Sequence, residues 1–354
     1  MPTGDQDDIK RLKGKGTRRS LVISILFSIA VLALVFALVP DRGRALQSLR
    51  SFSRQRLAVC ATLLIGAWFA DTLRLQLLTR GIARSCSFPL ALRAILAGNF
   101  MTLITPFLFG GAPVVVYGLK KTGMNWGEAT AVVVGGGIVS QFALLTLAVW
   151  STMRLDHFGA VIAWEGLYHF LVPAYAVGLV GFSVMALRAD VVEAWMKSWL
   201  TQARTAPHQH GTLRLRLVYV GRKLIHDLKE FRKSLCLLAR ENVVYVAAAY
   251  LCALLYFMMI FFMGPVILSG LGVRYPRIVV FALQVLVYVV AGFTPTPGGS
   301  GAAELGSFVL LSPVAPVHVI GAFLVVWRLF TFYLNLLVGG VAFTLILREM
   351  LAEE

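Results

Sequence analysis

The chain has 354 residues, of which 58% are hydrophobic and 14% are charged, and its mean hydropathy is +0.78. This composition excludes an ordinary soluble domain, in which charged residues make up about a quarter of the chain, and indicates a protein of the lipid bilayer. The net charge of +16 does not indicate a nucleic-acid-binding protein, because the Lys and Arg residues lie between apolar segments and form no separate basic domain.

The first apolar segment is Ser20 to Pro40, and it follows a basic N-terminus, residues 1–19, with six basic and three acidic side chains. Its length is that of a membrane span, about 20 residues, and no small-residue cleavage site follows it. We therefore expect an uncleaved span and a cytoplasmic N-terminus. The loop that follows opposes this topology, because its basic excess is of a kind that rarely faces outward: Arg42, Arg44, Arg50, Arg54 and Arg56.

A second span is predicted at Leu57 to Leu78, and it returns the chain to the cytoplasm at Arg80 and Arg84. The next apolar stretch, Pro89 to Leu119, is interrupted by Pro and Gly, and two lysines follow it directly. Since both flanks carry basic residues, we predict a re-entrant hairpin over 89–119 that enters and leaves on the cytoplasmic side. A bilayer tolerates such a break only where the backbone is buried or faces water.

Two further spans, Glu128 to Trp150 and Val161 to Leu187, complete a membrane segment over residues 20–187. A basic cytoplasmic loop, residues 188–242, comes next; between its positions 188 and 240 it holds eleven Lys and Arg residues against four acids. Within it, apolar residues recur at helical spacing: Leu217, Val220, Leu224, Leu228, Phe231, Leu235 and Leu238. The pattern predicts an amphipathic helix whose basic face meets anionic headgroups. The alternative is a helix packed on the cytoplasmic ends of the spans.

The last membrane segment, residues 243–348, completes the second half. It contains a span at Val243 to Leu268, a second interrupted stretch at Ile278 to Leu311, and a span at Val319 to Leu347. When Val161 to Leu187 is counted as the first span of that half, both halves have the order span, span, hairpin, span. The interrupted stretch, 278–311, is predicted to be a re-entrant hairpin from the outer side. The sequence thus predicts an all-α polytopic membrane protein with six spans and two hairpins, arranged as an inverted repeat with both termini in the cytoplasm.

The two interruptions share a Thr-Pro pair followed by a Gly-Gly pair: Thr105, Pro106, Gly110 and Gly111 in the first, and Thr294, Pro295, Gly298 and Gly299 in the second. Pro removes a backbone donor and Gly permits unusual dihedral angles, so the helices must break at these positions. Free backbone groups and a half-helix that starts near Ala302 predict a binding site for a lipid phosphate. The alternative is a hinge, or a close helix contact through small residues.

Charged side chains inside spans cost about 2.5–3.5 kcal/mol on insertion scales, so each needs a partner or a role. Glu304 follows the second break and Arg328 lies in the last span, and we predict that they pair. Asp71 and Arg74, three residues apart, are expected to satisfy each other. Four further polar side chains are candidates for the cavity wall, helix contacts or the lipid interface: Asn99, Gln141, Asn335 and Arg93.

Known catalytic and metal-binding patterns are missing from the sequence. It contains neither G-x-x-x-x-G-K-[ST] nor H-E-x-x-H, and residues 298–302, GGSGA, do not complete G-x-S-x-G. The four cysteines show no metal-like spacing, and His208 and His210 lie in a polar loop. We therefore expect no catalytic residue, no cofactor, no metal and no ATP site.

The segment Thr294 to Glu304, TPTPGGSGAAE, followed by Arg328, resembles the C-terminal signature of the lysylphosphatidylglycerol synthase transmembrane-region family, also called flippase-like membrane proteins. The stretch Asn99 to Gly123, which contains TPFLFGGAPVVVYGLKKTG, is similar to the other signature of that family. The resemblance covers about residues 20 to 348. It implies two facing re-entrant hairpins and the transfer of an anionic or modified phospholipid, or an isoprenoid-type lipid, between leaflets.

By this resemblance the family's motif positions are Pro297, Gly298, Gly299, Gly301, Glu304 and Arg328 in the second half, and Thr105, Pro106, Gly110 and Gly111 in the first. With Asn99, Thr294 and Pro295 they form the predicted lipid pathway. The first half departs from the family at Ala112, Val115 and Gly137, where members often carry charged side chains.

The expected function is that of a lipid flippase of the bacterial inner membrane without its own ATP site. Because the chain stops at Glu354, we expect no aminoacyl-transferase domain and no synthesis of a modified lipid. The alternative function is a non-transporting membrane subunit that presents lipid to a partner enzyme. The expected partners are membrane lipids with anionic headgroups, together with a second copy of the chain or a lipid-synthesising enzyme, and no nucleic acid.

Overall fold

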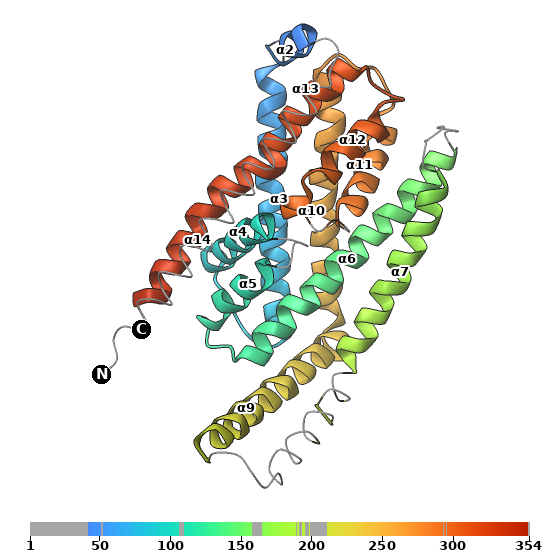
Figure 1. The fold of residues 1–354 in the computed structure, drawn as a ribbon. Helices are drawn as coiled ribbons and strands as arrows, with labels where there is room; N and C mark the ends of the chain where they lie inside the picture. Colours follow the sequence, from blue (N-terminus) through green and yellow to red (C-terminus); the bar gives the residue numbers. More distant parts are fainter. Residues whose placement is uncertain are drawn as a thin grey trace.

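The computed structural model describes residues 42–50, 52–105, 110–157, 165–188, 211–292 and 296–352, with a few isolated positions between them. These residues form helices and turns and contain no strand (Figure 1). The predicted first span, residues 20–40, lies outside them. The helices are α2 Arg42–Arg50, α3 Arg54–Gly81, α4 Phe88–Ile104, α5 Gly111–Lys120, α6 Trp126–His157, α7 Glu165–Leu187, α9 Gly211–Cys236, α10 Val243–Gly270, α11 Arg277–Gly292, α12 Ala302–Leu311, α13 Val317–Arg328 and α14 Leu334–Ala352, with π-helical turns at Leu237–Glu241 and Leu329–Tyr333.

Five helices are long and apolar enough to cross a bilayer: Arg54–Gly81, Trp126–Asp156, Tyr168–Leu187, Val243–Gly270 and Val317–Glu349. They coincide with five of the predicted spans, and the last of them runs through α13, a π-helical turn and α14 without a gap. The chain is therefore an all-α polytopic membrane protein, as its hydropathy predicts.

Two pairs of shorter helices fold back on themselves as hairpins. The arms α4 and α5 pack against each other, as do α11 and α12. In Figure 1 the first hairpin opens toward the end of the molecule where α9 lies, and the second opens toward the end where α2 lies. The helix residues that border these turns, Ile104 of α4 and Ala303 of α12, are buried. The helix bounds, 88–120 and 277–311, agree closely with the predicted hairpins, while their re-entrant position in a membrane stays a prediction.

Each half of the molecule packs its hairpin against the last span of the other half. The contact between α3 and α10 is the most extensive, and these two helices stand at the centre of Figure 1. The first hairpin lies on the last span of the second half through α4 and α14. The second hairpin lies on the last span of the first half through α11 and α6. An inverted repeat requires this exchange, although the repeat itself stays a prediction.

The basic loop contains α9, which packs on the ends of α6 and α7. A Cβ atom at Gly127 of α6 would clash with the carbonyl oxygen of Asp227 and would lie 2.8 Å from the amide nitrogen of Phe231. The backbones of α6 and α9 therefore touch, and Leu235 and Leu238 are buried beside this contact. The alternative weighed above, a helix packed on the span ends, describes this part of α9. Contact of its basic face with anionic headgroups stays a prediction.

Candidate functional site

The second break is built by glycines in conformations that L-residues rarely adopt. Gly298, Gly299 and Gly301 have φ angles of 60°, 63° and 93°. A side chain at such an angle costs roughly 1–2 kcal/mol. A Cβ atom at Gly298 would also lie 2.5 Å from the ring of Phe332 and 3.3 Å from the carbonyl oxygen of Leu103. The turn between α11 and α12 therefore rests directly on the end of α4, so the two breaks meet.

The first break is closed by its own threonine. The Thr105 hydroxyl donates to the carbonyl oxygen of Met101 at 2.7 Å and accepts from the Gly110 amide at 2.9 Å. A Cβ atom at Gly111 would clash with the Thr102 hydroxyl and lie 2.6 Å from the carbonyl oxygen of Gly98. These contacts hold the arms of the hairpin together. Thr105, Gly110 and Gly111 thus shape the hairpin without lining the cavity described next.

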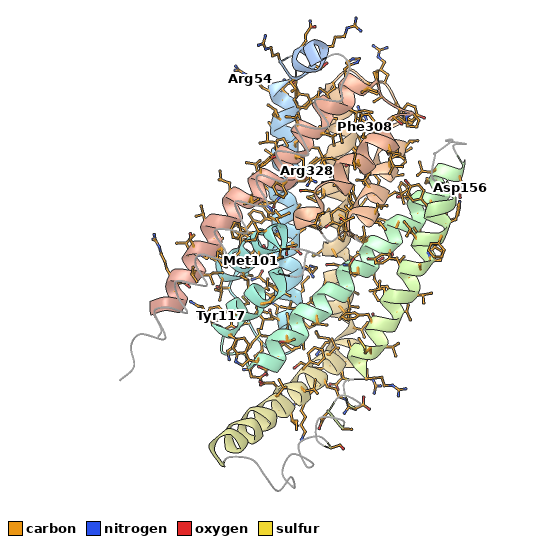
Figure 2. The ribbon with its side chains drawn as sticks, viewed as in Figure 1. Arg54, Met101, Tyr117, Asp156, Phe308 and Arg328 are labelled. Atoms are coloured by element: carbon orange, nitrogen blue, oxygen red, sulfur yellow. The ribbon has the colours of Figure 1, made fainter. Side chains whose placement is uncertain are left out.

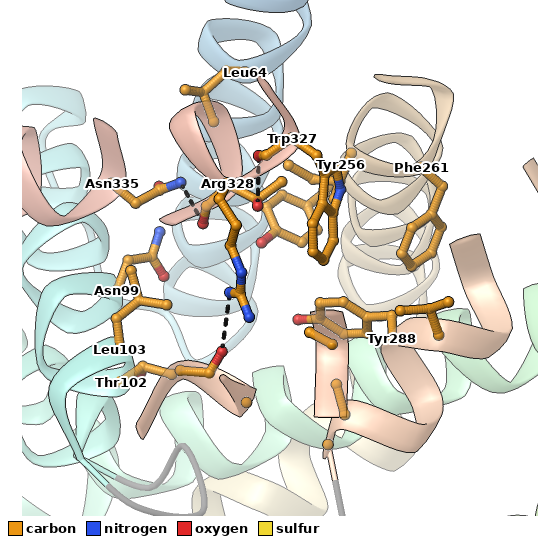
Figure 3. Close-up of a pocket in the computed structure, with 18 of the residues that line it drawn as sticks. Leu64, Asn99, Thr102, Leu103, Tyr256, Phe261, Tyr288, Trp327, Arg328 and Asn335 are labelled. Carbon is orange, nitrogen blue, oxygen red and sulfur yellow. Dashed lines mark hydrogen bonds between the residues drawn. The ribbon is translucent and has the colours of Figure 1, made fainter. Parts of the chain in front are cut away.

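A cavity of about 140 Å³ lies where the two breaks meet (Figure 3). Four of the predicted pathway residues line it, namely Asn99, Gly298, Gly299 and Arg328. Aliphatic and small side chains form much of the remaining wall. Its aromatic, hydroxyl and amide groups come from α3, α4, α10, α11, α13, the π-helical turn after Arg328 and α14: Trp68, Thr102, Tyr256, Phe261, Tyr288, Trp327, Thr331 and Asn335.

The other predicted pathway residues lie beside the cavity or outside the described part of the chain. Thr294 donates from its hydroxyl to the carbonyl oxygen of Ala291 at 2.7 Å and so caps the end of α11. Pro106 and Pro295 are not among the described positions, and for Pro297 only the backbone, a 3-10 turn, is described.

The predicted pair of Glu304 and Arg328 is confirmed. Arg328 Nε lies 2.7 Å from Glu304 Oε1, and the two side chains are 3% and 0% exposed. The two groups are not aligned as a hydrogen bond, and Arg328 Nη2 has no hydrogen-bond partner in the described part of the structure. Arg328 Nη1 donates to the carbonyl oxygen of Gly298 over a long 3.4 Å. Arg328 is therefore neutralised but keeps donor capacity at the cavity.

The start of α12 is occupied by the protein's own carboxylate. Glu304 Oε2 accepts a hydrogen bond from the Gly301 amide at 2.7 Å, one turn before it. A negative group at this point is stabilised by the helix dipole. The prediction that this helix start binds a lipid phosphate is therefore wrong for the Gly301 amide. Arg328 carries the one positive charge among the described residues that line the cavity.

Aromatic groups surround that guanidinium. Its Cζ atom lies 5.2 Å from the centre of the Trp327 ring and 5.4 Å from that of Phe332, within the range of cation–π attraction. Figure 3 shows Tyr256 and Tyr288 with their hydroxyl ends directed toward Arg328. Apart from the carboxylate of Glu304, the described groups around this charge are thus aromatic rings and neutral hydroxyl groups.

The helix containing Arg328 continues as a π-helical turn that Asn335 stabilises. Its Nδ2 donates to the carbonyl oxygens of Phe330 and Thr331 at 3.0 and 3.2 Å, and its Oδ1 accepts from Trp68 Nε1 at 2.8 Å. The predicted helix-to-helix hydrogen bond of Asn335 is confirmed. Because π-helical turns often occur at functional sites, its position directly after Arg328 agrees with a role for this part of the helix.

Replacing Asn335 by leucine is expected to lower the unfolding free energy by about 1–3 kcal/mol, because the Trp68 indole N–H and two carbonyl groups lose their partner. The matched control is Thr344→Val on the same helix, which removes an exposed hydroxyl that bonds only to Val341. Thermal unfolding in one detergent would compare them, and equal midpoints for the two variants would contradict a structural role for Asn335.

The remaining polar candidates pair with other groups of the protein. Asp71 and Arg74 pair at 2.6 Å, as predicted. Gln141 accepts a hydrogen bond from the hydroxyl of Tyr175 on α7, which confirms a helix-to-helix contact. Arg93 lies 3.6 Å from a carboxylate near the end of α14, so its partner is a protein side chain. None of these residues lines the cavity between the hairpins.

The sequence did not single out the aromatic walls of the cavity. Trp68, Tyr256 and Tyr288 lie in apolar helices, where an aromatic residue usually belongs to the packed core. Thr102 and Thr331 were missed for a similar reason, since a threonine in a span commonly bonds to its own helix. Thr331 does so through the carbonyl oxygen of Trp327 at 2.8 Å.

Comparisons with known proteins agree with this architecture. The model of the lysylphosphatidylglycerol synthase TM region matches residues 21–339, a range that contains both breaks, Glu304 and Arg328. A UPF0104 membrane protein of Archaeoglobus fulgidus is 24% identical over 322 residues, which cover 91% of this chain and 95% of that protein. The chain therefore belongs to the family of the lysylphosphatidylglycerol synthase TM region, as its two motifs indicated.

Proposed function

We propose that this protein moves a phospholipid or an isoprenoid-type lipid between the two leaflets, with the headgroup passing through the cavity between the hairpins. The observation that carries the proposal is a buried arginine, Arg328, with an unpartnered guanidinium nitrogen at the point where two helix breaks meet. A buried charge in a membrane protein is costly unless it has a role. Glu304 neutralises the guanidinium, but Nη2 of Arg328 is left without a hydrogen-bond partner among the described residues.

The guanidinium fits a phosphate. Arginine binds phosphate oxygens through two parallel N–H groups, and such charge-assisted bonds strengthen where water is excluded. In the empty protein the pair with Glu304 keeps the cavity neutral. A headgroup phosphate then accepts from Arg328 Nη2, while Nε stays beside Glu304. The tyrosine and asparagine groups of the wall offer further hydrogen bonds to the rest of the headgroup.

The size and position of the cavity suit a headgroup better than a whole lipid. About 140 Å³ cannot hold acyl chains, so these would remain in the bilayer beside the helices. The hairpins open toward opposite ends of the molecule, so a small movement of each would connect the cavity to one membrane surface at a time. Transport of this type needs no catalytic residue, and we expect the protein not to be an enzyme.

The proposed setting is the inner membrane of a bacterium, with the N- and C-termini in the cytoplasm. The end of α14 lies at the same end of the molecule as the basic helix α9, which supports a cytoplasmic C-terminus (Figure 1).

The test is a leaflet assay in liposomes, in which dithionite bleaches fluorescent lipid in the outer leaflet only. The wild-type protein is expected to flip a fluorescent anionic phospholipid faster than protein-free vesicles do. Gly292 lines the cavity and a Cβ atom there meets no atom of the described residues within 4 Å. Gly292→Leu is therefore expected to fold and to reduce flipping about fivefold or more by narrowing the path.

The matched control is Gly178→Leu on α7, where an added Cβ atom also meets no atom within 4 Å, and which lies away from the cavity. This variant is expected to flip lipid at the wild-type rate. Wild-type protein that flips no lipid class faster than empty vesicles would contradict the proposal and favour a subunit that only presents lipid to a partner.

A further inference from the structure

A second cavity, of about 460 Å³, lies at the end of the molecule opposite α9, between the start of α3, the end of α10 and the start of α11. This volume falls within the range of small-molecule sites, roughly 300–1,000 Å³. Three arginines line the cavity, Arg56, Arg274 and Arg277, and no acidic side chain is found among its described lining residues. Figure 2 shows the neighbouring Arg54 at this end, above Arg328 in the view.

Arg56 is held in place on the wall of this cavity. Its Nη1 donates to the Ser269 hydroxyl at 3.3 Å, and that hydroxyl in turn donates to the carbonyl oxygen of Val266 at 3.0 Å. A Cβ atom at Gly270 would clash with Phe52 and lie 3.0 Å from Arg56 Cδ. The glycine therefore lets the start of α3 pack closely against α10, and the remaining guanidinium nitrogens of Arg56 have no hydrogen-bond partner among the described residues.

Arg274 and Arg277 come from the turn between α10 and α11. Gly272, with a φ angle of 85°, ends the preceding helix, and Arg277 is the first residue of α11. The positive end of the α11 dipole thus adds to the field of the side chains. Arg274 and Arg277 are exposed, and neither they nor Arg56 forms an ion pair with a described residue. Three positive charges therefore converge on one cavity without a counter-charge from the described chain.

We propose that this second cavity binds the phosphate of a lipid headgroup at the membrane surface opposite α9. Arginine guanidinium groups recognise phosphate through paired hydrogen bonds. Three of them around one cavity are expected to bind a phosphate more tightly than a single surface arginine does. Lipid is favoured over a soluble phosphate because Tyr275 and Ile278, 38% and 41% exposed, flank the arginines at the ends of two membrane helices. Tyr beside an apolar residue at this level is typical of the bilayer interface.

The site also gives a role to the basic excess at this end of the molecule. The stretch 42–56 carries five arginines and no acid, and the turn 271–277 adds two arginines. Basic residues are usually concentrated on one side of a membrane, so an excess of arginines at the end opposite the basic loop is unfavourable. Anionic lipid headgroups at that end would compensate the positive charge. The inference does not depend on transport, because a lipid can bind at this surface whether or not the central cavity moves it.

The test is photo-cross-linking of the purified full chain, in nanodiscs of phosphatidylcholine, with a phosphatidylglycerol analogue that carries its photoreactive group on the headgroup. Peptide mass spectrometry would quantify adducts on residues 268–281 separately from those at the central cavity. Wild-type protein is expected to form adducts in this segment. The variant R274Q/R277Q is expected to form about tenfold fewer, since each lost charged hydrogen bond weakens binding substantially.

The matched control is R50Q/R54Q, which removes two exposed arginines from the same end but outside the cavity. It is expected to keep its adducts within about twofold of the wild type, because diffuse surface charge contributes little. Equal losses in both variants, or no adducts in the wild type, would overturn the site. Competition by inorganic phosphate as potent as that by unlabelled phosphatidylglycerol would overturn its assignment to lipid.

Discussion

Arg328→Met is expected to lower the unfolding free energy by about 3–5 kcal/mol, because it leaves the carboxylate of Glu304 buried without a counter-charge. Adding Glu304→Gln is expected to restore much of that loss. Glutamine still accepts the Gly301 amide through its side-chain oxygen, and the double variant buries no charge at this point. The pair would then show a strong coupling in a double-mutant cycle.

Thermal unfolding of the wild type, both single variants and the double variant in the same detergent would measure this coupling. If the stability losses of the two single variants add up to the loss of the double variant, a direct ion pair is contradicted. A stability equal to wild type for Arg328→Met alone would contradict the expected cost of a buried Glu304 carboxylate without its counter-charge.

The second large effect is expected at the first hairpin, where Gly111→Ala should destabilise the protein by about 2 kcal/mol or more. The added methyl group would clash with the Thr102 hydroxyl and approach the carbonyl oxygen of Gly98 to 2.6 Å. The hydroxyl can rotate away, but the carbonyl belongs to the backbone of α4, so the arms of the hairpin must separate.

Gly137→Ala is a control for which we expect the stability to change in the opposite direction. Gly137 lies within α6, is exposed, and an added Cβ atom there meets no atom within 4 Å. Alanine is a better helix former than glycine, so this variant should be neutral or more stable by about 0.5–1 kcal/mol. Unfolding midpoints that shift in the same direction for both variants would contradict the tight packing of α4 against α5.

The sequence predicted five long helices and the two pairs of packed short helices, because membrane spans are defined by apolar length and breaks are defined by Pro and Gly. The re-entrant position of these pairs in a membrane stays a prediction. The pairing of Glu304 with Arg328 was predictable for a similar reason, since two opposite charges in apolar helices stabilise each other. The contact between the two breaks could not be predicted, because it depends on how Gly298 lies against Leu103 in a distant helix.

The predicted site was less accurate than the predicted fold. Thr105 and Thr294 satisfy backbone groups of their own hairpins, and sequence spacing does not distinguish such a cap from a ligand contact. Conversely, Trp68 and Tyr288 line the cavity, although their sequence context is that of core residues. Their role follows from the tertiary arrangement of α3, α4 and α11, which local patterns do not encode.

The most direct test of the central claim is the leaflet assay on the double variant E304Q/R328M, after its folding has been verified by thermal unfolding. Its control is D71N/R74M, which removes another ion pair of the membrane helices, 2.6 Å long, that does not line the cavity. If Arg328 binds the headgroup phosphate, E304Q/R328M flips anionic phospholipid no faster than protein-free vesicles, and D71N/R74M flips it at close to the wild-type rate. Wild-type flipping by folded E304Q/R328M would contradict the account.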